Sequence, residues 1–104
     1  MATLFEPLNL RGVELKNRLV RSATYEAMAA ESGGVTDALV AHYHQLARGE
    51  VGLIITGHAY VHPLGKAARY QMGLHDDRLL RGLRWLTEAV HEEGGRIVFQ
   101  LAHA

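Results

Sequence analysis

Val51-Gly52-Leu53-Ile54-Ile55 decides the fold class, because this apolar run has no polar alternation. A strand that is covered on both faces in a parallel sheet has this pattern. Parallel neighbours need a long crossover connection between them, and this connection is usually a helix. The segments on either side of the run are therefore expected to be helical.

Both neighbouring segments have helical patterns. In the first, Thr36 can cap the amino terminus and Gly49 ends the helix, and four residues share one face: Leu39, Tyr43, Leu46 and Ala47. In the second, Asp76 or Asp77 is the expected cap and Gly94-Gly95 stops the helix. Its apolar face consists of Leu79, Leu83, Leu86 and Val90. Each helix is long enough to cross over a sheet.

Further strands are expected before and after these helices. Residues 18–23 are predicted to form the first strand of the sheet and residues 96–101 the last, while residues 56–75 are expected to be a long loop. At the amino terminus, residues 8–10 and 13–15 flank Arg11-Gly12, which suits the turn of a small hairpin. The expected order is a hairpin followed by β-α-β-α-β.

This order predicts an α/β protein with a parallel sheet, either open and doubly wound or closed into a barrel. The three strands should be adjacent in chain order. Three strands complete neither design, because the outer two would keep unpaired apolar edges. The chain is therefore expected to be a piece of a larger enzyme.

Composition excludes several classes of protein. The 104 residues contain 11 basic and 11 acidic side chains without a basic block, so neither nucleic acid nor a membrane surface is an expected partner. Cysteine is absent, which excludes disulfides and thiolate metal sites. Residues 1–6 lack a charged leader followed by an apolar core, and we expect a cytoplasmic protein.

The carboxyl ends of the expected strands carry small and hydrogen-bonding residues, at the edge where parallel sheets bind ligands. These segments are Ser22-Ala23-Thr24-Tyr25, Thr56-Gly57-His58-Ala59-Tyr60 and Gln100-Leu101-Ala102-His103. Small residues let a flat ligand lie against the main chain, and a glutamine amide offers both a donor and an acceptor. The pattern favours a planar heterocycle. The alternative is that such residues stand there only because loops begin at strand ends.

Other chemistry is poorly supported. The chain has seven histidines, but His42 and His44 are two apart on a predicted helix, and His58 and His62 lie in the long loop, so no metal site is expected. No glycine-rich dinucleotide turn or P-loop follows a strand. Tyr43 and Trp85 are interpreted as packing residues of the two helices.

Four segments, taken in order, resemble the old yellow enzyme family of flavin-dependent ene-reductases and related 2,4-dienoyl-CoA reductases. They are Leu4-Phe5-Glu6-Pro7-Leu8, Leu15-Lys16-Asn17-Arg18-Leu19-Val20, Gly52-Leu53-Ile54-Ile55-Thr56-Gly57 and Gln100-Leu101-Ala102-His103-Ala104. The resemblance implies the amino-terminal part of a (β/α)8 TIM barrel, with FMN at the carboxyl ends of the strands. The hairpin would close the bottom of the barrel.

The resemblance also implies roles for residues of the first strand end. Ser22, Ala23 and Thr24 would pass along the flavin ring, and Tyr25 would lie near the position that tunes the ring. The residue at that position varies in the family, and some relatives have a threonine or cysteine there.

At the second and third strand ends, Gly57 and His58 match the small residues that follow the second strand of relatives, with a histidine in place of alanine or glycine. Gln100 matches the glutamine that hydrogen-bonds the pyrimidine edge of FMN, and His103 matches a structural histidine. No catalytic residue is assigned, because the proton donor and the phosphate site of relatives lie on later strands.

The resulting expectation is an oxidoreductase that passes hydride from NADH or NADPH through FMN to an activated alkene, a small-molecule substrate. Residues 1–104 would be an incomplete amino-terminal segment of one FMN-binding barrel domain, inactive alone and able to self-associate. Two alternatives remain: another barrel or open-sheet enzyme that binds a phosphorylated metabolite, and a short non-enzymatic chain that a partner completes.

Overall fold

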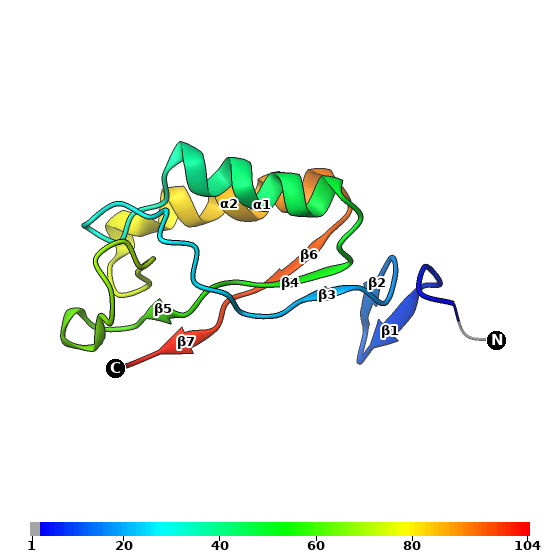
Figure 1. Cartoon of the computed structure of the whole chain (residues 1–104), viewed down its shortest axis with the longest axis horizontal. Coiled ribbons are helices and arrows are strands. Elements are labelled where there is room, and N and C mark those ends of the chain that lie inside the picture. The colour runs from blue at the N-terminus through cyan, green and yellow to red at the C-terminus, as the bar shows by residue number, and fades with distance from the viewer. Residues whose placement is uncertain (1–2) are drawn as a thin grey trace.

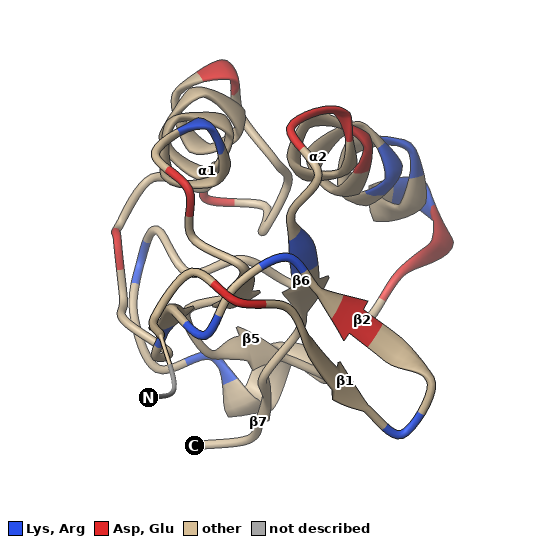
Figure 2. Ribbon diagram, turned by 90° about the vertical axis from the view of Figure 1, so that its right-hand side faces the viewer, with Lys and Arg blue, Asp and Glu red and all other residues tan. Residues whose placement is uncertain are grey.

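The computed structural model describes residues 3–104. Met1 and Ala2 lie outside the described residues. They begin the segment in which the sequence predicts no leader. Two helices, α1 and α2, cover one face of a three-stranded sheet, and a hairpin lies at one end of the chain (Figure 1). Seen along the sheet, the two helices lie side by side above it (Figure 2).

The central sheet is parallel and has the order β3-β4-β6. Its strands are β3 (Val20–Arg21), β4 (Leu53–Ile55) and β6 (Arg96–Val98). In the register, Val20 pairs with Leu53, and Ile54 pairs with Ile97. The predicted order and direction of the strands are confirmed, although each strand is shorter than its apolar run.

The expected strand over residues 96–101 is divided in two, which corrects the sequence prediction. The strand pairing is interrupted at Phe99 and Gln100, and β7 (Leu101–Ala102) then pairs in parallel with β5 (Ala59–Tyr60). Residues 56–75, expected to be a plain loop, thus contain β5 and a short 3-10 helix, η1 (Pro63–Gly65). The local pattern missed this extension because two-residue strands depend on a partner that is distant in sequence.

Helix α1 (Asp37–Arg48) begins and ends where the sequence predicts. The Thr36 hydroxyl accepts a hydrogen bond from the Leu39 N–H at 3.1 Å, and Gly49 follows the last turn. Helix α2 (Leu80–Glu92) has no side-chain cap, because Asp76 instead caps a preceding 3-10 turn, η2 (Asp77–Leu79). The predicted cap residue, Asp76, is confirmed, but the first turn that it caps is a 3-10 turn, and the α-helix begins only at Leu80.

The core lies between the two helices and the sheet. Helix α1 contributes Leu39, Tyr43 and Ala47, the sheet contributes Ile54, and the α2 residues Leu86, Ala89 and Val90 complete it. Tyr43 is fully buried, as expected of a packing residue. Trp85 is 43% exposed, so its interpretation as a packing residue is wrong.

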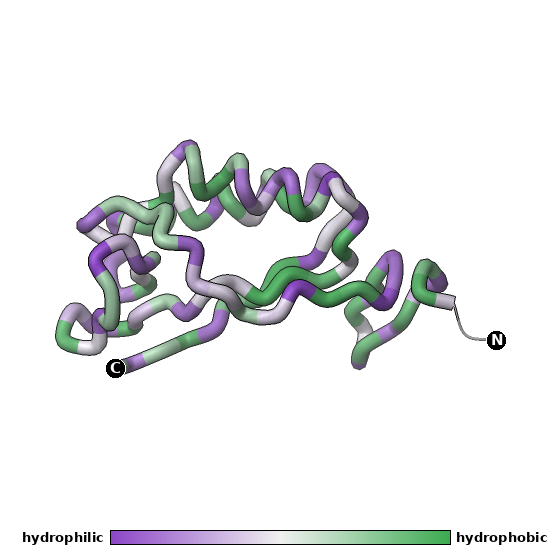
Figure 3. The backbone as a smooth tube through the Cα atoms, in the orientation of Figure 1, coloured by the Kyte–Doolittle hydropathy of each residue, from purple (hydrophilic) through white to green (hydrophobic). Residues whose placement is uncertain are grey.

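The face of the sheet opposite the helices is apolar but lies open. Val20 and Val98 are 52% and 50% exposed, and apolar stretches, drawn green, run along the central strands (Figure 3). Within residues 3–104 the sheet is thus covered on one face only, although the uninterrupted apolar runs predict cover on both.

The hairpin consists of β1 (Leu8–Leu10) and β2 (Val13–Leu15), paired antiparallel as predicted. Arg11 and Gly12 both have positive φ, 47° and 92°, as a two-residue type I′ turn requires. Neither helix in residues 3–104 has the length and apolar character needed to span a membrane.

Candidate functional site

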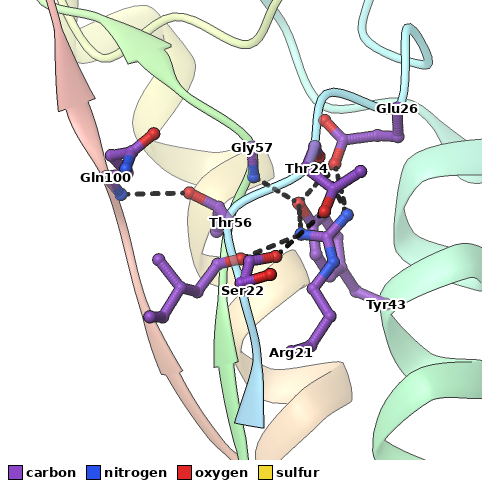
Figure 4. A network of polar contacts seen from close by, with 9 residues as sticks. Arg21, Ser22, Thr24, Glu26, Tyr43, Thr56, Gly57 and Gln100 are labelled. Atoms are coloured by element: carbon purple, nitrogen blue, oxygen red, sulfur yellow. Dashed lines mark hydrogen bonds and ion pairs between the residues drawn. The ribbon is translucent and has the colours of Figure 1, made fainter.

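The carboxyl ends of β3, β4 and β6 bring the seven predicted site residues to one end of the sheet. Figure 4 shows four of them: Ser22, Thr24, Gly57 and Gln100. Ser22 to Tyr25 follow β3, Gly57 and His58 follow β4, and Gln100 follows β6. Because the strands are parallel and adjacent, these three segments leave the sheet at the same edge. The site expected from the sequence is therefore spatially coherent.

Gln100 is held by its main chain and presents its side chain outward. Its N–H donates to the Thr56 hydroxyl at 3.2 Å, and its carbonyl oxygen accepts from the Ala59 N–H at 2.8 Å. The Gln100 residue is exposed, and none of the hydrogen bonds found within residues 3–104 uses its amide group. The amide is thus free to bind a ligand from a fixed backbone position.

Gly57 is the point at which the first and second strand ends touch. A Cβ atom at this position would lie 2.7 Å from the carbonyl oxygen of Thr24 and 3.0 Å from a carboxylate oxygen of Glu26. Real Cβ atoms do not approach other atoms so closely, so only glycine fits here without a shift of the main chain. Ser22 and Thr24 are exposed beside this contact, and Ala23 is half-buried.

Tyr25 and His58 pack against each other across the two strand ends. Their rings meet edge to face, with centroids 5.6 Å apart, and Tyr25 remains 41% exposed. The carbonyl oxygen of His58 accepts from the Gln71 amide at 3.2 Å. Gln71 is fully buried and also accepts from the Ala67 N–H at 2.7 Å, so it fixes the loop that supports His58.

A buried polar network, formed by Arg21, Glu26 and Tyr43, lies between the strand ends and α1 (Figure 4). The Tyr43 hydroxyl donates to Glu26 at 2.5 Å and accepts from the Gly57 N–H at 3.0 Å. The Arg21 guanidinium contacts the same Glu26 carboxylate at 3.3 Å. Sequence reasoning missed this network, because Tyr43 was assigned to packing and nothing in the local pattern pairs Arg21 with Glu26.

Burial and the hydrogen bond to Glu26 raise the pKa of Tyr43 to about 12. The Gly57 N–H and the Arg21 charge oppose this shift and are outweighed. Tyr43 therefore keeps its proton at neutral pH and acts as a donor to Glu26.

The histidines do not gather into a metal site within residues 3–104, where no group of three potential ligands occurs. His103 lies beside Gly65 and His62, with the two imidazole centroids 6.4 Å apart. His103 is exposed, and the structural role that the resemblance implies for it stays a prediction.

The sequence profile of the NADH:flavin oxidoreductase / NADH oxidase family matches residues 3–104. The chain belongs to this family. Among its relatives is an NADPH dehydrogenase of Bacillus subtilis (strain 168), 39% identical over 102 residues, which are 97% of this chain and 30% of the relative. The expected old yellow enzyme resemblance is thereby supported by sequence.

Solved structures agree with this assignment. An old yellow enzyme from Pichia sp. AKU4542 superposes with a TM-score of 0.89 at 30% identity, over 96% of this chain and 26% of that one. Morphinone reductase in complex with tetrahydroNAD superposes with a TM-score of 0.88 at 29% identity, over 99% of this chain and 28% of that one. The chain thus spans less than a third of the length of these relatives. Its predicted fold, the amino-terminal part of a (β/α)8 TIM barrel with a hairpin, is confirmed.

The residues at the strand ends fit FMN, the cofactor expected for the family. A flat ring system requires small residues beneath it and polar groups at its edge. Ala23 and Gly57 are the small residues, and the exposed Ser22, Thr24 and Gln100 supply the polar groups.

Proposed function

We propose that the protein containing this chain is an FMN-dependent oxidoreductase, which passes hydride from NADH or NADPH to an activated alkene, as ene-reductases do. One observation carries the proposal: an unused glutamine amide stands at the ligand-binding edge of a parallel sheet, in a chain of the flavin oxidoreductase family. When bound, the flavin would supply the hydride-transfer chemistry, as cofactors do in such enzymes.

The residues of this chain would bind and orient the cofactor. Gln100 would donate its amide N–H and accept through its amide oxygen at the pyrimidine edge, where both kinds of partner are needed. Ser22, Ala23 and Thr24 would lie along the ring, and Gly57 would allow close approach of the main chain. Tyr25 and His58, as an edge-to-face pair, would form one wall of the site.

The remaining parts of the activity are assigned to later strands. A TIM barrel needs roughly 250 residues, so residues 1–104 form an incomplete domain that should not turn over substrate alone. The names of relatives support both reductants, one being an NADPH dehydrogenase and another a reductase solved with tetrahydroNAD. The small-molecule substrate, the lack of nucleic-acid and membrane partners and the cytoplasmic location stay predictions.

The proposal is tested by replacing Gln100 in the full-length protein. Leucine is similar in size but leaves polar ligand atoms buried without partners, at a cost of about 1–3 kcal/mol. We expect Gln100→Leu to weaken FMN binding by roughly 5- to 150-fold, as measured by titrating FMN into the apo protein.

Gln45→Leu is the matched control, because Gln45 is an exposed residue of α1 outside the site. It should bind FMN as the wild type does. Equal FMN affinity in all three proteins would refute the role of Gln100. A wild type that carries no flavin and binds a phosphorylated metabolite instead would refute the proposed function itself.

A further inference from the structure

The polar network of Arg21, Glu26 and Tyr43 buries a charged pair directly behind the candidate site. The side chains of Arg21 and Glu26 are only 13% and 5% exposed. Removing two charges from water is costly, and such a pair often stabilises a fold no better than apolar residues of the same volume. Stability alone therefore gives a weak reason for its presence.

Arg21 uses its donors on the main chain of both strand ends. Its guanidinium donates to the carbonyl oxygen of Ile55 at 2.9 Å and to that of Thr24 at 2.9 Å. The first carbonyl ends β4, and the second lies in the segment that follows β3. One side chain thus connects the two backbone segments that would contact the flavin ring.

Tyr43 connects the same two segments from the side of α1. Its hydroxyl accepts from the Gly57 N–H and from Arg21 at 3.1 Å, while it donates to Glu26. Glu26 follows the candidate site directly along the chain. Ala27 then adopts a positive φ of 55°, which is uncommon for a residue with a Cβ atom. The network thus holds Gly57 so close to Thr24 and Glu26 that a Cβ atom on residue 57 would lie 2.7 Å from the Thr24 carbonyl oxygen.

We infer that Arg21, Glu26 and Tyr43 are positioning residues, which fix the main chain of residues 22–25 relative to Gly57 and thereby set the affinity and reduction potential of the bound flavin. The inference rests on the proposed function. It deepens that function by assigning roles to three residues that do not themselves contact the cofactor. Sites that bind tightly need such supporting side chains, because small displacements of the contacting groups weaken binding.

The test measures FMN affinity and the flavin midpoint potential in the full-length holoenzyme. Tyr43→Phe removes one hydroxyl and keeps the buried ring, and Glu26→Gln removes the charge at nearly constant size. We expect each variant to bind FMN roughly tenfold more weakly. We also expect a shifted midpoint potential, about 30 mV for each tenfold change in the ratio of affinities for oxidised and reduced flavin.

Glu31→Gln is the matched control, because Glu31 pairs with Arg69 at the surface, where both side chains are more than half exposed. This variant should keep the wild-type affinity and potential. If either single variant fails to fold, the same two measurements are made on the double variant Arg21→Met with Glu26→Met. This variant removes both charges together, so that no unpaired charge stays buried.

The outcomes separate the inference from the proposed function. A wild type that binds no FMN refutes the proposed function and the inference with it. A wild type that binds FMN, with variants that melt at lower temperature but keep its affinity and potential, shows that the network is merely structural and overturns the inference. Weaker binding and a shifted potential in the network variants, with Glu31→Gln unchanged, support it.

Discussion

At the residue scale, Tyr43 both packs in the hydrophobic core and forms hydrogen bonds at the candidate site. The ring fills the core between α1 and β4, and the hydroxyl reaches Glu26 and Gly57 at the strand ends. A buried hydroxyl must keep its hydrogen bonds, because an unpaired polar group in the interior costs about 1–3 kcal/mol. Its protonation is therefore tied to folding.

The raised pKa of Tyr43 predicts a specific loss of stability in alkali. In the unfolded chain this tyrosine ionises near its usual pKa of 10.0, and in the folded protein near 12. The stabilising contribution is complete below pH 10 and is lost as the pH rises from 10 to 12. Two pKa units correspond to about 2–3 kcal/mol.

The measurement is urea unfolding of the full-length protein at pH 9 and at pH 11.5, for the wild type and for Tyr43→Phe. The wild type should lose more stability than the variant over this interval. A tyrosinate absorbance difference between the two proteins that titrates near pH 10 would contradict the prediction, because it would show Tyr43 ionising as an exposed tyrosine does.

The individual site residues differ in how far sequence alone could predict them. Gln100 and Gly57 could be placed at the same edge of the sheet from sequence, because each lies just beyond an apolar run and parallel strands bring such positions together. Their role in binding the cofactor stays a prediction. Glu26 and Tyr43 were missed, because their pairing joins a loop to a helix face 17 positions away. Gln71 was missed for the same reason, since its partners lie within a loop that has no periodicity.

At the element scale, Asn17 fixes how the hairpin segment meets the start of β4. Its side-chain amide donates to the carbonyl oxygen of Glu50, and its amide oxygen accepts from the Leu19 N–H at 3.0 Å. Asn17 is 2% exposed and lies against Gly52. Asn17 belongs to a segment that was singled out from the sequence only because it resembles the old yellow enzyme family. The structure shows that this asparagine packs against the main chain at the start of β4.

Gly52→Ala should therefore destabilise the protein. The added Cβ would meet the Asn17 amide oxygen and would lie 2.8 Å from the Asn17 carbonyl oxygen, and overpacking of this kind costs about 1–3 kcal/mol. Gly34→Ala is the control, because its Cβ would be 3.4 Å from the nearest atom, an ordinary contact. Urea unfolding of both variants checks the difference, and equal stabilities would refute the packing role of Asn17.

The elements themselves were predictable where the signal is local. Thr36 and Gly49 bound α1 as expected, since a cap and its helix are neighbours in sequence. Residues 96–101 did not form one strand, because the pairing beyond Val98 involves Thr56 and β5, which lie about 40 positions earlier. Pairing between distant short segments carries no periodic signal.

At the scale of the whole molecule, the chain leaves two apolar surfaces without cover in residues 3–104. One is the open face of the sheet with Val20 and Val98. The other is a groove between α2 and β7, lined by Leu74, Leu80, Leu83, Phe99 and Leu101. In a complete barrel, inward-facing side chains fill the interior and neighbouring units cover the helix flanks.

Residues 1–104 produced alone should consequently self-associate or melt without cooperativity, because exposed apolar patches and unpaired strand edges tend to bind other chains.

Leu101 is the residue of choice for a mutational test, because it is 67% exposed on β7 and lines the groove. Leu101→Lys should reduce association, as measured by the concentration dependence of the sedimentation coefficient. Leu64→Lys is the matched control, since Leu64 is 84% exposed in η1, outside the groove, and its replacement should change little. A segment that stays monomeric at every concentration and melts in one cooperative step would show that these surfaces need no cover, and that the three-stranded unit is a stable fold by itself.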